Sequence, residues 1–177
     1  MKVLLINKTF GNFGGGAEKA SYHTGKLLQQ KGVEVIFFSS NKQPYYENNY
    51  KYSTFFPEDF STAERFSPLK LFYNIEAERN LNRLIQEVKP DIAHINCIMH
   101  SLTPSVLVAC RKNKIPSVVT FHDSHFACPS ATLMKGFCHY CQKVDCINGN
   151  ILSCLTNRCF SGSFKKSLIA GLEFLFR

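Results

Sequence analysis

Short apolar runs alternate with helical patterns along this chain. Residues 3–6 and 33–38 are almost wholly apolar, as expected of strands that are covered on both faces. Two similar runs occupy residues 91–96 and 117–121, the second of which reads as a buried strand running out into a loop. The segments between the runs carry apolar residues at three- and four-residue spacing, which is typical of helices. This alternation predicts an α/β fold: a doubly wound, mostly parallel Rossmann-like sheet.

The pattern also predicts where helices begin, end and face the sheet. The first helix is expected to end at Gly32, after an apolar face marked by Ala20, Thr24, Leu27 and Leu28. The second is stopped by Pro90 and is marked by Leu71, Ile75, Leu81, Leu84, Ile85 and Val88. The third covers residues 103–112, with Thr103 as N-cap and Pro104 at the first helical position.

Two segments do not fit a simple alternation. Residues 39–67 are polar and aromatic without a sustained period, so they predict a long excursion from the sheet. Residues 164–176 predict one more helix, whose apolar end has no following element to cover it. We therefore expect the chain to be part of a longer protein.

Length and charge narrow the class of protein. The chain has 177 residues and 45% hydrophobic composition, which suits one domain spanning residues 1–177. No signal peptide or membrane-length apolar run is present, so a cytoplasmic location is expected. The net charge of +8 calls for an anionic partner. Because the basic residues are spread, we expect peripheral contact with the anionic inner face of the cell membrane and no nucleic acid.

A glycine-rich loop follows the first predicted strand. Backbone N–H groups at a helix N-terminus can meet a phosphate there, and glycines allow a close approach. The candidate phosphate-binding residues are Gly14, Gly15 and Gly16. The alternative is a tight turn that needs positive φ angles. The second strand ends in Phe38 and two serines, with no acid to bind a ribose, so an NAD-type oxidoreductase is not expected.

His122 and Asp123 follow the fourth predicted strand. At that position a histidine can bind a ligand, and a neighbouring acid can set its tautomer. The alternative is a structural histidine bonded to a backbone carbonyl, and His125 could instead form a metal-binding pair. His94 lies within the third predicted strand and is expected to be a satisfied sheet histidine.

Six of the eight cysteines fall between residues 128 and 159, within a cysteine-rich loop predicted at 123–160. Cys138 and Cys141 have the Cys-x-x-Cys spacing at which two thiolates reach one tetrahedral ion. The sequence predicts a structural zinc with the ligands Cys128, Cys138, Cys141 and Cys159, and with Cys146 and Cys154 as alternates. The rival interpretation is a set of inert or redox-active thiols. Cys97 and Cys110 are expected to be small core residues.

Several of these motifs occur together in a known family. The stretches "MKVLLINKTFGNFGGGAEK", "KPDIAHIN" and "IPSVVTFHDSHFACP" resemble the N-terminal half of GT-B glycosyltransferases of the family-4 type. The stretches "FCHYC" and "NRCFSGSFKKSL" resemble the cysteine-bearing branch of that family. The resemblance covers essentially the whole chain, with a loose match at residues 39–67.

The resemblance implies a retaining hexosyltransferase with two Rossmann-like domains, of which this chain is the N-terminal, acceptor-side domain. Gly15 and Gly16 would face the diphosphate of a nucleotide-sugar donor, and His122 would contact the donor sugar, with Asp123 and Glu18 as possible support. No catalytic metal is implied. The C-terminal nucleotide-sugar domain is absent from residues 1–177, so the fragment alone is expected to be inactive. The implied acceptor is a glycan or lipid-linked molecule of cell-surface polysaccharide or lipopolysaccharide synthesis.

A second class of function stays open at this stage. A zinc-stabilised, non-enzymatic binding module could use the basic surface on nucleic acid or another polyanion. Against it, aromatic residues are not interleaved with Lys and Arg as a stacking surface requires.

Overall fold

The computed structural model describes residues 1–10, 15–40, 72–99, 101–135, 139–141 and 145–175. The chain divides into two compact units, Met1–Thr120 and Phe121–Arg177, and each is described by itself. The long excursion expected at residues 39–67 lies mostly outside the described residues. Its first two residues, Ser39 and Ser40, are buried.

Unit 1 contains a four-stranded sheet in the order β2-β1-β3-β4, and every neighbouring pair is parallel. The strands are β1 (Lys2–Ile6), β2 (Glu34–Phe38), β3 (Ile92–Ile95) and β4 (Ser117–Val119). Strand β2 pairs with one side of β1, and the chain then crosses over to place β3 on the other side of β1. Ligands of open α/β sheets bind at such a switch point, beyond the carboxyl ends of the strands.

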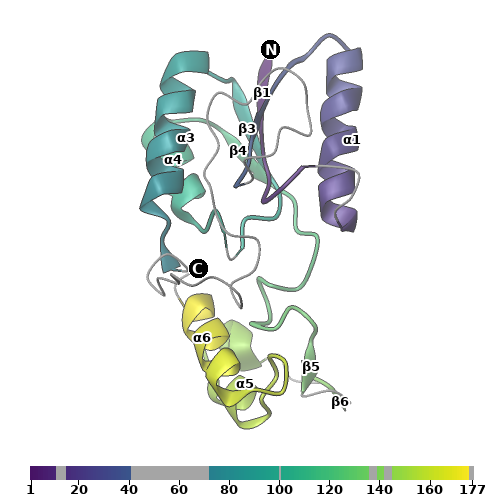
Figure 1. The fold of residues 1–177 in the computed structure, drawn as a ribbon, viewed down its shortest axis with the longest axis vertical. Coiled ribbons are helices and arrows are strands. Elements are labelled where there is room, and N and C mark those ends of the chain that lie inside the picture. The colour runs from purple at the N-terminus through teal and green to yellow at the C-terminus, as the bar shows by residue number, and fades with distance from the viewer. Residues whose placement is uncertain (11–14, 41–71, 100, 136–138, 142–144, 176–177) are drawn as a thin grey trace. The chain divides into compact units, whose positions relative to one another are not determined.

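Helices cover both faces of this sheet (Figure 1). Helix α1 (Gly16–Gln30) lies on one face, and α3 (Ile75–Val88) and α4 (Ser105–Lys112) lie on the other. Alternate residues of a strand point to opposite faces. Accordingly, Val3 and Leu5 belong to one hydrophobic cluster, whereas Leu4 and Ile6 belong to the other. The predicted doubly wound α/β fold is confirmed.

The buried face of α1 differs from the predicted one. Ala20 is exposed and Leu27 is 57% exposed, whereas Ser21 and Gly25 are buried. A Cβ atom at Gly25 would lie 2.7 Å from the ring of Phe37. Small residues therefore face the sheet because the helix packs too close to it for larger ones. This close packing carries no hydrophobic signal in the sequence.

The ends of α1 and α3 follow local rules. Gly32 has a φ of +77° just beyond α1, which confirms the predicted helix stop. Helix α3 begins at Ile75, because the side chain of Asn74 accepts a hydrogen bond from the Ala77 N–H group at 3.0 Å. Leu71, which the apolar pattern assigns to this helix, lies outside the described residues.

Thr103 is not the N-cap of α4. That position belongs to Pro104, and Thr103 has a φ of 58°. The Thr103 hydroxyl accepts a hydrogen bond from the backbone N–H of Asn74 at 3.0 Å and a longer one from the Ser105 N–H at 3.4 Å. It therefore ties the start of α3 to the start of α4, a tertiary role that the local sequence pattern does not reveal.

The fourth strand is shorter and more exposed than predicted. It ends at Val119, before residue 121, and Val118 is 51% exposed. Within the described residues β4 has a hydrogen-bonded neighbour on one side only, which is β3. Two consecutive valines at a sheet edge resemble part of a buried strand in sequence, so composition alone did not distinguish the two cases.

Unit 2 consists of short elements and one longer helix. Strands β5 (Met134–Lys135) and β6 (His139–Tyr140) form an antiparallel pair. A 3₁₀ helix, η1 (Asp145–Asn148), and a short helix, α5 (Leu152–Thr156), follow. Helix α6 (Phe164–Leu175) confirms the predicted final helix; it buries Ser167 and Ala170 and leaves larger apolar side chains exposed.

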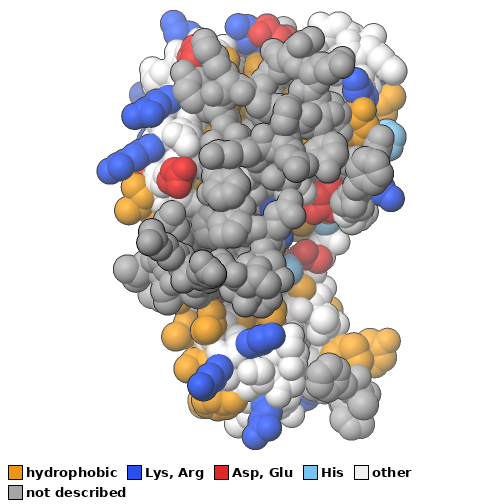
Figure 2. Space-filling view, in the orientation of Figure 1, with side chains coloured by type: hydrophobic (Ala, Val, Ile, Leu, Met, Phe, Trp, Pro, Cys, Tyr) orange, Lys and Arg blue, Asp and Glu red, His pale blue; other side chains and the backbone are white. Residues whose placement is uncertain are grey.

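The described residues include no helix that is both long and apolar enough to cross a bilayer. On the face shown in Figure 2, the visible Lys and Arg side chains are scattered over the surface and form no continuous stripe.

Candidate functional site

The segments that follow β1 and β3 are joined by buried hydrogen bonds. Asn7, directly after β1, is fully buried. Its side-chain amide donates to the Thr9 carbonyl at 2.7 Å, and its amide oxygen accepts from the Cys97 N–H at 3.1 Å. The Lys8 N–H donates to the Cys97 carbonyl at 2.6 Å. These bonds fix the backbone at the switch point of the sheet.

The segment after β2 joins the same network. The backbone N–H and the hydroxyl of Ser40 both donate to the Lys8 carbonyl, at 3.0 and 2.6 Å. The Asn7 N–H donates to the Phe38 carbonyl at 3.2 Å. Buried polar groups are stable only when they are paired in this way. The sequence does carry a signal for this hydrogen-bonded network, because a polar residue directly follows each apolar run. The spacing of the apolar residues alone does not reveal it.

Phe10 anchors the chain where the glycine-rich loop begins. Its buried ring meets the ring of Phe37 edge-on, with centroids 5.0 Å apart. Gly14, one of the three candidate phosphate-binding residues, lies outside the described residues. Gly15 and Gly16 are described, and they form the N-terminus of α1.

Backbone geometry does not require glycine at position 15 or at position 16. Gly15 is the N-cap of α1, with φ −68° and ψ −174°, a conformation that any residue adopts. Gly16 has no positive φ either, and a Cβ atom there would meet no atom of the described residues within 4 Å. The tight-turn interpretation is therefore wrong for these two positions. Open space above Gly16 is what a backbone-bound ligand would require.

The charge at this helix end favours Gly16 over Gly15 as the point of approach. The first N–H groups of a helix lack partners within the helix and attract anions. Glu18, in the first turn, already faces Gly15: its Oε2 lies 3.0 Å from where a Cβ atom of Gly15 would be. A phosphate at Gly15 would meet that carboxylate. The role of Glu18 as support stays a prediction, and α1 has no side-chain hydrogen bond at its N-cap.

His122 lies in unit 2 and is exposed. The carboxylate of Asp123 contacts His125: it accepts from the His125 N–H at 2.9 Å, and its second oxygen lies 2.9 Å from the His125 Nδ1 atom. The described contacts therefore assign Asp123 to His125. In unit 1, His94 Nε2 lies 2.8 Å from the Thr120 hydroxyl, which confirms that His94 is a satisfied sheet histidine.

Comparison with known protein families identifies the group to which these features belong. The profile of Glycosyltransferase Family 4 matches residues 14–149, which is most of the chain and includes the N-terminus of α1, the whole sheet from β2 onward and His122. The chain belongs to glycosyltransferase family 4. Searches among curated proteins and among solved structures found no match.

Four thiols of this family 4 chain gather in unit 2. Burial raises the pKa of the Cys154 thiol to about 12, and the charges of three neighbouring thiols and a side-chain hydrogen bond to one of them, Cys159, act in the same direction. The four thiols that interact in this way are Cys128, Cys146, Cys154 and Cys159. The two cysteines expected in the core of unit 1 differ: Cys110 is buried, and Cys97 is half-buried.

This cluster differs from the ligand set that the spacing suggested. Cys138 lies outside the described residues, and Cys141 is half-buried with its N–H bonded to the Leu133 carbonyl at 2.7 Å. Within the described part of the chain, no three His, Cys, Asp or Glu side chains have an arrangement that would hold a metal ion as they stand. All seven described cysteines are free of disulfide bonds.

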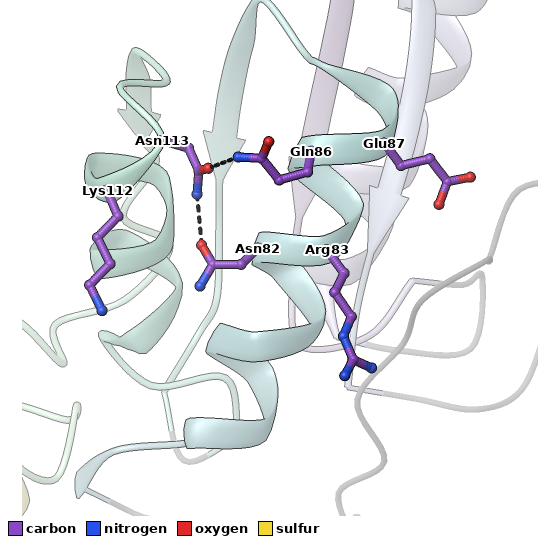
Figure 3. Close-up of a pocket in the computed structure, with 6 residues that line it drawn as sticks. All are labelled: Asn82, Arg83, Gln86, Glu87, Lys112 and Asn113. Atoms are coloured by element: carbon purple, nitrogen blue, oxygen red, sulfur yellow. Dashed lines mark hydrogen bonds between the residues drawn. The ribbon is translucent and has the colours of Figure 1, made fainter.

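A surface groove between α3 and α4 is not the donor site of a glycosyltransferase. It has a volume of about 610 Å³ and is open to solvent. In Figure 3 Asn113, one of the lining residues, accepts a hydrogen bond from Gln86 at 2.5 Å and donates one to Asn82 at 2.7 Å. These residues lie toward the ends of α3 and α4 that lead into the amino ends of β3 and β4. The groove is therefore remote from the carboxyl edge, where open α/β sheets bind ligands.

Proposed function

We propose that this chain is the acceptor-side, N-terminal domain of a retaining GT-B glycosyltransferase. In this proposal the enzyme moves a hexose from a nucleotide-sugar donor to a glycan or lipid-linked acceptor of cell-surface polysaccharide or lipopolysaccharide synthesis. Membership of family 4 supports the transfer of a sugar. The observation that supports the assignment of a site is the N-terminus of α1 at Gly16: it follows β1 along the chain, and no described residue lies within 4 Å of its Cβ position.

The N-terminus of α1 suits the leaving group of such a reaction. Breaking the bond between sugar and diphosphate builds negative charge on the diphosphate. Helix N–H groups near Gly16 would stabilise that charge, and the regular backbone of α1 fixes their direction before the donor binds. Fixed donors of this kind contribute about a hundredfold to a thousandfold in rate each. No catalytic metal is needed for this step.

His122 is proposed to contact the donor sugar. Thr120 lies directly after β4, and a chain spans at most about 3.5 Å per residue, so the backbone of His122 stays within about 7 Å of Thr120. His122 is exposed, so a ligand can reach it. Asp123 then acts indirectly, by holding the turn at His125.

The remaining parts of the donor and the acceptor call for other contacts. We propose that a second domain holds the nucleoside, so that residues 1–177 alone bind the donor weakly and turn over little. The net charge of +8 supports peripheral contact with an anionic membrane, where a lipid-linked acceptor would be presented. The alternative function, a polyanion-binding module, gains no support from the scattered basic side chains visible in Figure 2.

The proposed function is tested by a donor screen on the full-length enzyme. UDP-, GDP- and dTDP-linked hexoses are each incubated with the enzyme, and release of nucleoside diphosphate is followed with and without membrane extracts as acceptor. We expect one donor to be consumed, with hexose incorporated into the extract at the same anomeric configuration, as read by NMR. Consumption of none of the donors would remove the transferase assignment, and inversion of configuration would remove the retaining mechanism.

A further inference from the structure

Helix α6 buries its small residues and exposes its large ones. It packs within unit 2 through Ser167, Ala170 and Gly171, which are all buried. A Cβ atom at Gly171 would lie 3.3 Å from the side chain of Ile151, so α6 lies close against the start of α5. The larger apolar side chains of the helix are exposed. A helix on the surface of a water-soluble protein usually has the opposite arrangement, so the outer face of α6 fits a partner that accepts apolar side chains.

The exposed apolar residues of α6 share one side of the helix. Four of them follow one another at spacings of four, four and three residues, which places them in one line along the helix axis. A fifth, one position after the second, widens this line. We call the five residues the apolar face of α6; they are Phe164, Leu168, Ile169, Leu172 and Leu175.

The exposed charges near the apolar face are positive. Arg158, Lys165 and Lys166 are all exposed, whereas Glu173 is the only acidic residue that the sequence has after η1, and it is buried. Lys165 lies one turn before Ile169, so it stands on the same side of α6 as the apolar face. Figure 2 shows hydrophobic and Lys or Arg side chains together on the part of the surface that α5 and α6 form. This surface is therefore both apolar and cationic.

We propose that the apolar face of α6, with the basic residues beside it, docks this enzyme on the anionic surface of a lipid bilayer. The inference rests on the proposed function, in which a lipid-linked acceptor is presented at a membrane, and it names the surface that makes the contact. The helix has 12 residues and is about 18 Å long, too short to cross a hydrocarbon core of about 30 Å. It would lie in the plane of the interface, with its apolar face among the acyl chains and its lysines at the lipid phosphates.

Charge favours a lipid surface over a second protein surface as the partner. Lys and Arg side chains are rarely buried in a protein interface without an acidic partner. Among the described residues after η1 no acidic side chain is exposed, so two copies meeting through α6 would bring like charges together. An anionic bilayer avoids this conflict. The long side chains of Lys165 and Lys166 can reach the headgroup phosphates while their apolar neighbours lie deeper.

The test is sedimentation of the purified full-length protein with lipid vesicles, in the absence of donor and acceptor. Vesicles of phosphatidylethanolamine and phosphatidylglycerol should bind the wild type at least about tenfold more tightly than vesicles of phosphatidylcholine. The double variant Leu168→Ser, Leu172→Ser should bind the anionic vesicles at least about tenfold more weakly than the wild type. Leu27→Ser is the matched control, because Leu27 is an exposed leucine on α1, outside the apolar face, and it should bind as the wild type does.

The basic residues are tested in the same assay. The double variant Lys165→Gln, Lys166→Gln should lose about fivefold in affinity for anionic vesicles per lysine and keep its weak affinity for phosphatidylcholine. High salt should remove most of the difference between this variant and the wild type, because it screens the attraction to the headgroups. Lys31→Gln, at an exposed lysine beyond the end of α1, is the control for loss of one positive charge.

Three results would overturn this proposal. The first is equal vesicle binding by the wild type and the leucine double variant, or no binding by the wild type. The second is a Tm lowered by the leucine substitutions, which would assign the apolar face to a contact within the same chain. The third is a change of oligomeric state in analytical ultracentrifugation, which would assign it to a second copy. Donor consumption in solution should be unchanged in both double variants, so a failure of the docking surface is distinguishable from a failure of the transferase assignment.

Discussion

Replacing His122 with alanine is expected to lower sugar transfer about a hundredfold and to leave thermal stability nearly unchanged. The loss follows from our assignment of the imidazole to the donor sugar, where a contact made in the transition state affects the rate directly. Stability should hold because His122 is exposed, so the substitution uncovers no buried group. The measurements are kcat and KM for the full-length enzyme with its identified donor, together with the Tm.

Two histidines serve as controls for this substitution. His23 is exposed on α1, and His23→Ala should change neither rate nor Tm. His125 contacts Asp123 at 2.9 Å with a side chain that is 16% exposed, so His125→Ala should lower the Tm more than the turnover per folded enzyme. A large loss of stability in His122→Ala with unchanged turnover would instead support the structural alternative for His122.

The second large effect concerns folding. Gly25→Val should destabilise unit 1 by about 3 kcal/mol and lower its Tm by about 10 °C. A Cβ atom at Gly25 would lie 2.7 Å from the Phe37 ring and 3.0 Å from Leu5. The ring cannot move away easily, because Phe10 packs against its other edge and Leu5 is fully buried. Thermal denaturation of the full-length protein measures the shift.

Gly16→Val is the matched control for folding, since it places the same side chain on the same helix. Because no described residue lies within 4 Å of the Cβ position of Gly16, this variant should keep the wild-type Tm. Equal Tm values for the two variants would contradict this explanation, because close packing of α1 on the sheet would then not require glycine at position 25. Gly16 lies in the stretch "GGAEK" and Gly25 in "TGKL". Packing against Phe37 requires glycine at position 25, whereas no described residue requires it at position 16.

Much of the sheet could be predicted because its signals are local. Apolar runs such as residues 33–38 gave the order of strands and helices, and Gly32 marked a helix end through its positive φ. The face of α1 could not be predicted this way. Ser21 and Gly25 are buried because the helix lies close to the sheet, and small residues have no apolar signature. Thr103 was misassigned for a related reason, since its hydroxyl is used by a distant helix.

The candidate site was predicted less completely than the fold. The glycines at the N-terminus of α1 were found from sequence, but only the structure separates Gly15, which Glu18 faces, from Gly16, which is open. The thiols show the limit most clearly. Spacing favoured Cys138 and Cys141 as ligands beside Cys128 and Cys159, and this set stays a prediction because Cys138 lies outside the described residues. The structure adds that the Cys154 thiol interacts with Cys128, Cys146 and Cys159. Which thiols meet depends on how η1 and α5 pack, and sequence spacing does not contain that information.

The central claim is that the backbone near Gly16 receives the diphosphate of the donor. Calorimetry on full-length Gly16→Val tests it directly, by comparing Kd values for the nucleoside diphosphate and for the free nucleoside of the identified donor. A valine side chain should exclude the phosphates but leave the nucleoside contacts intact. We predict that the variant binds the diphosphate at least about tenfold more weakly, binds the nucleoside with unchanged affinity and keeps its Tm. Unchanged affinity for the diphosphate would contradict the account.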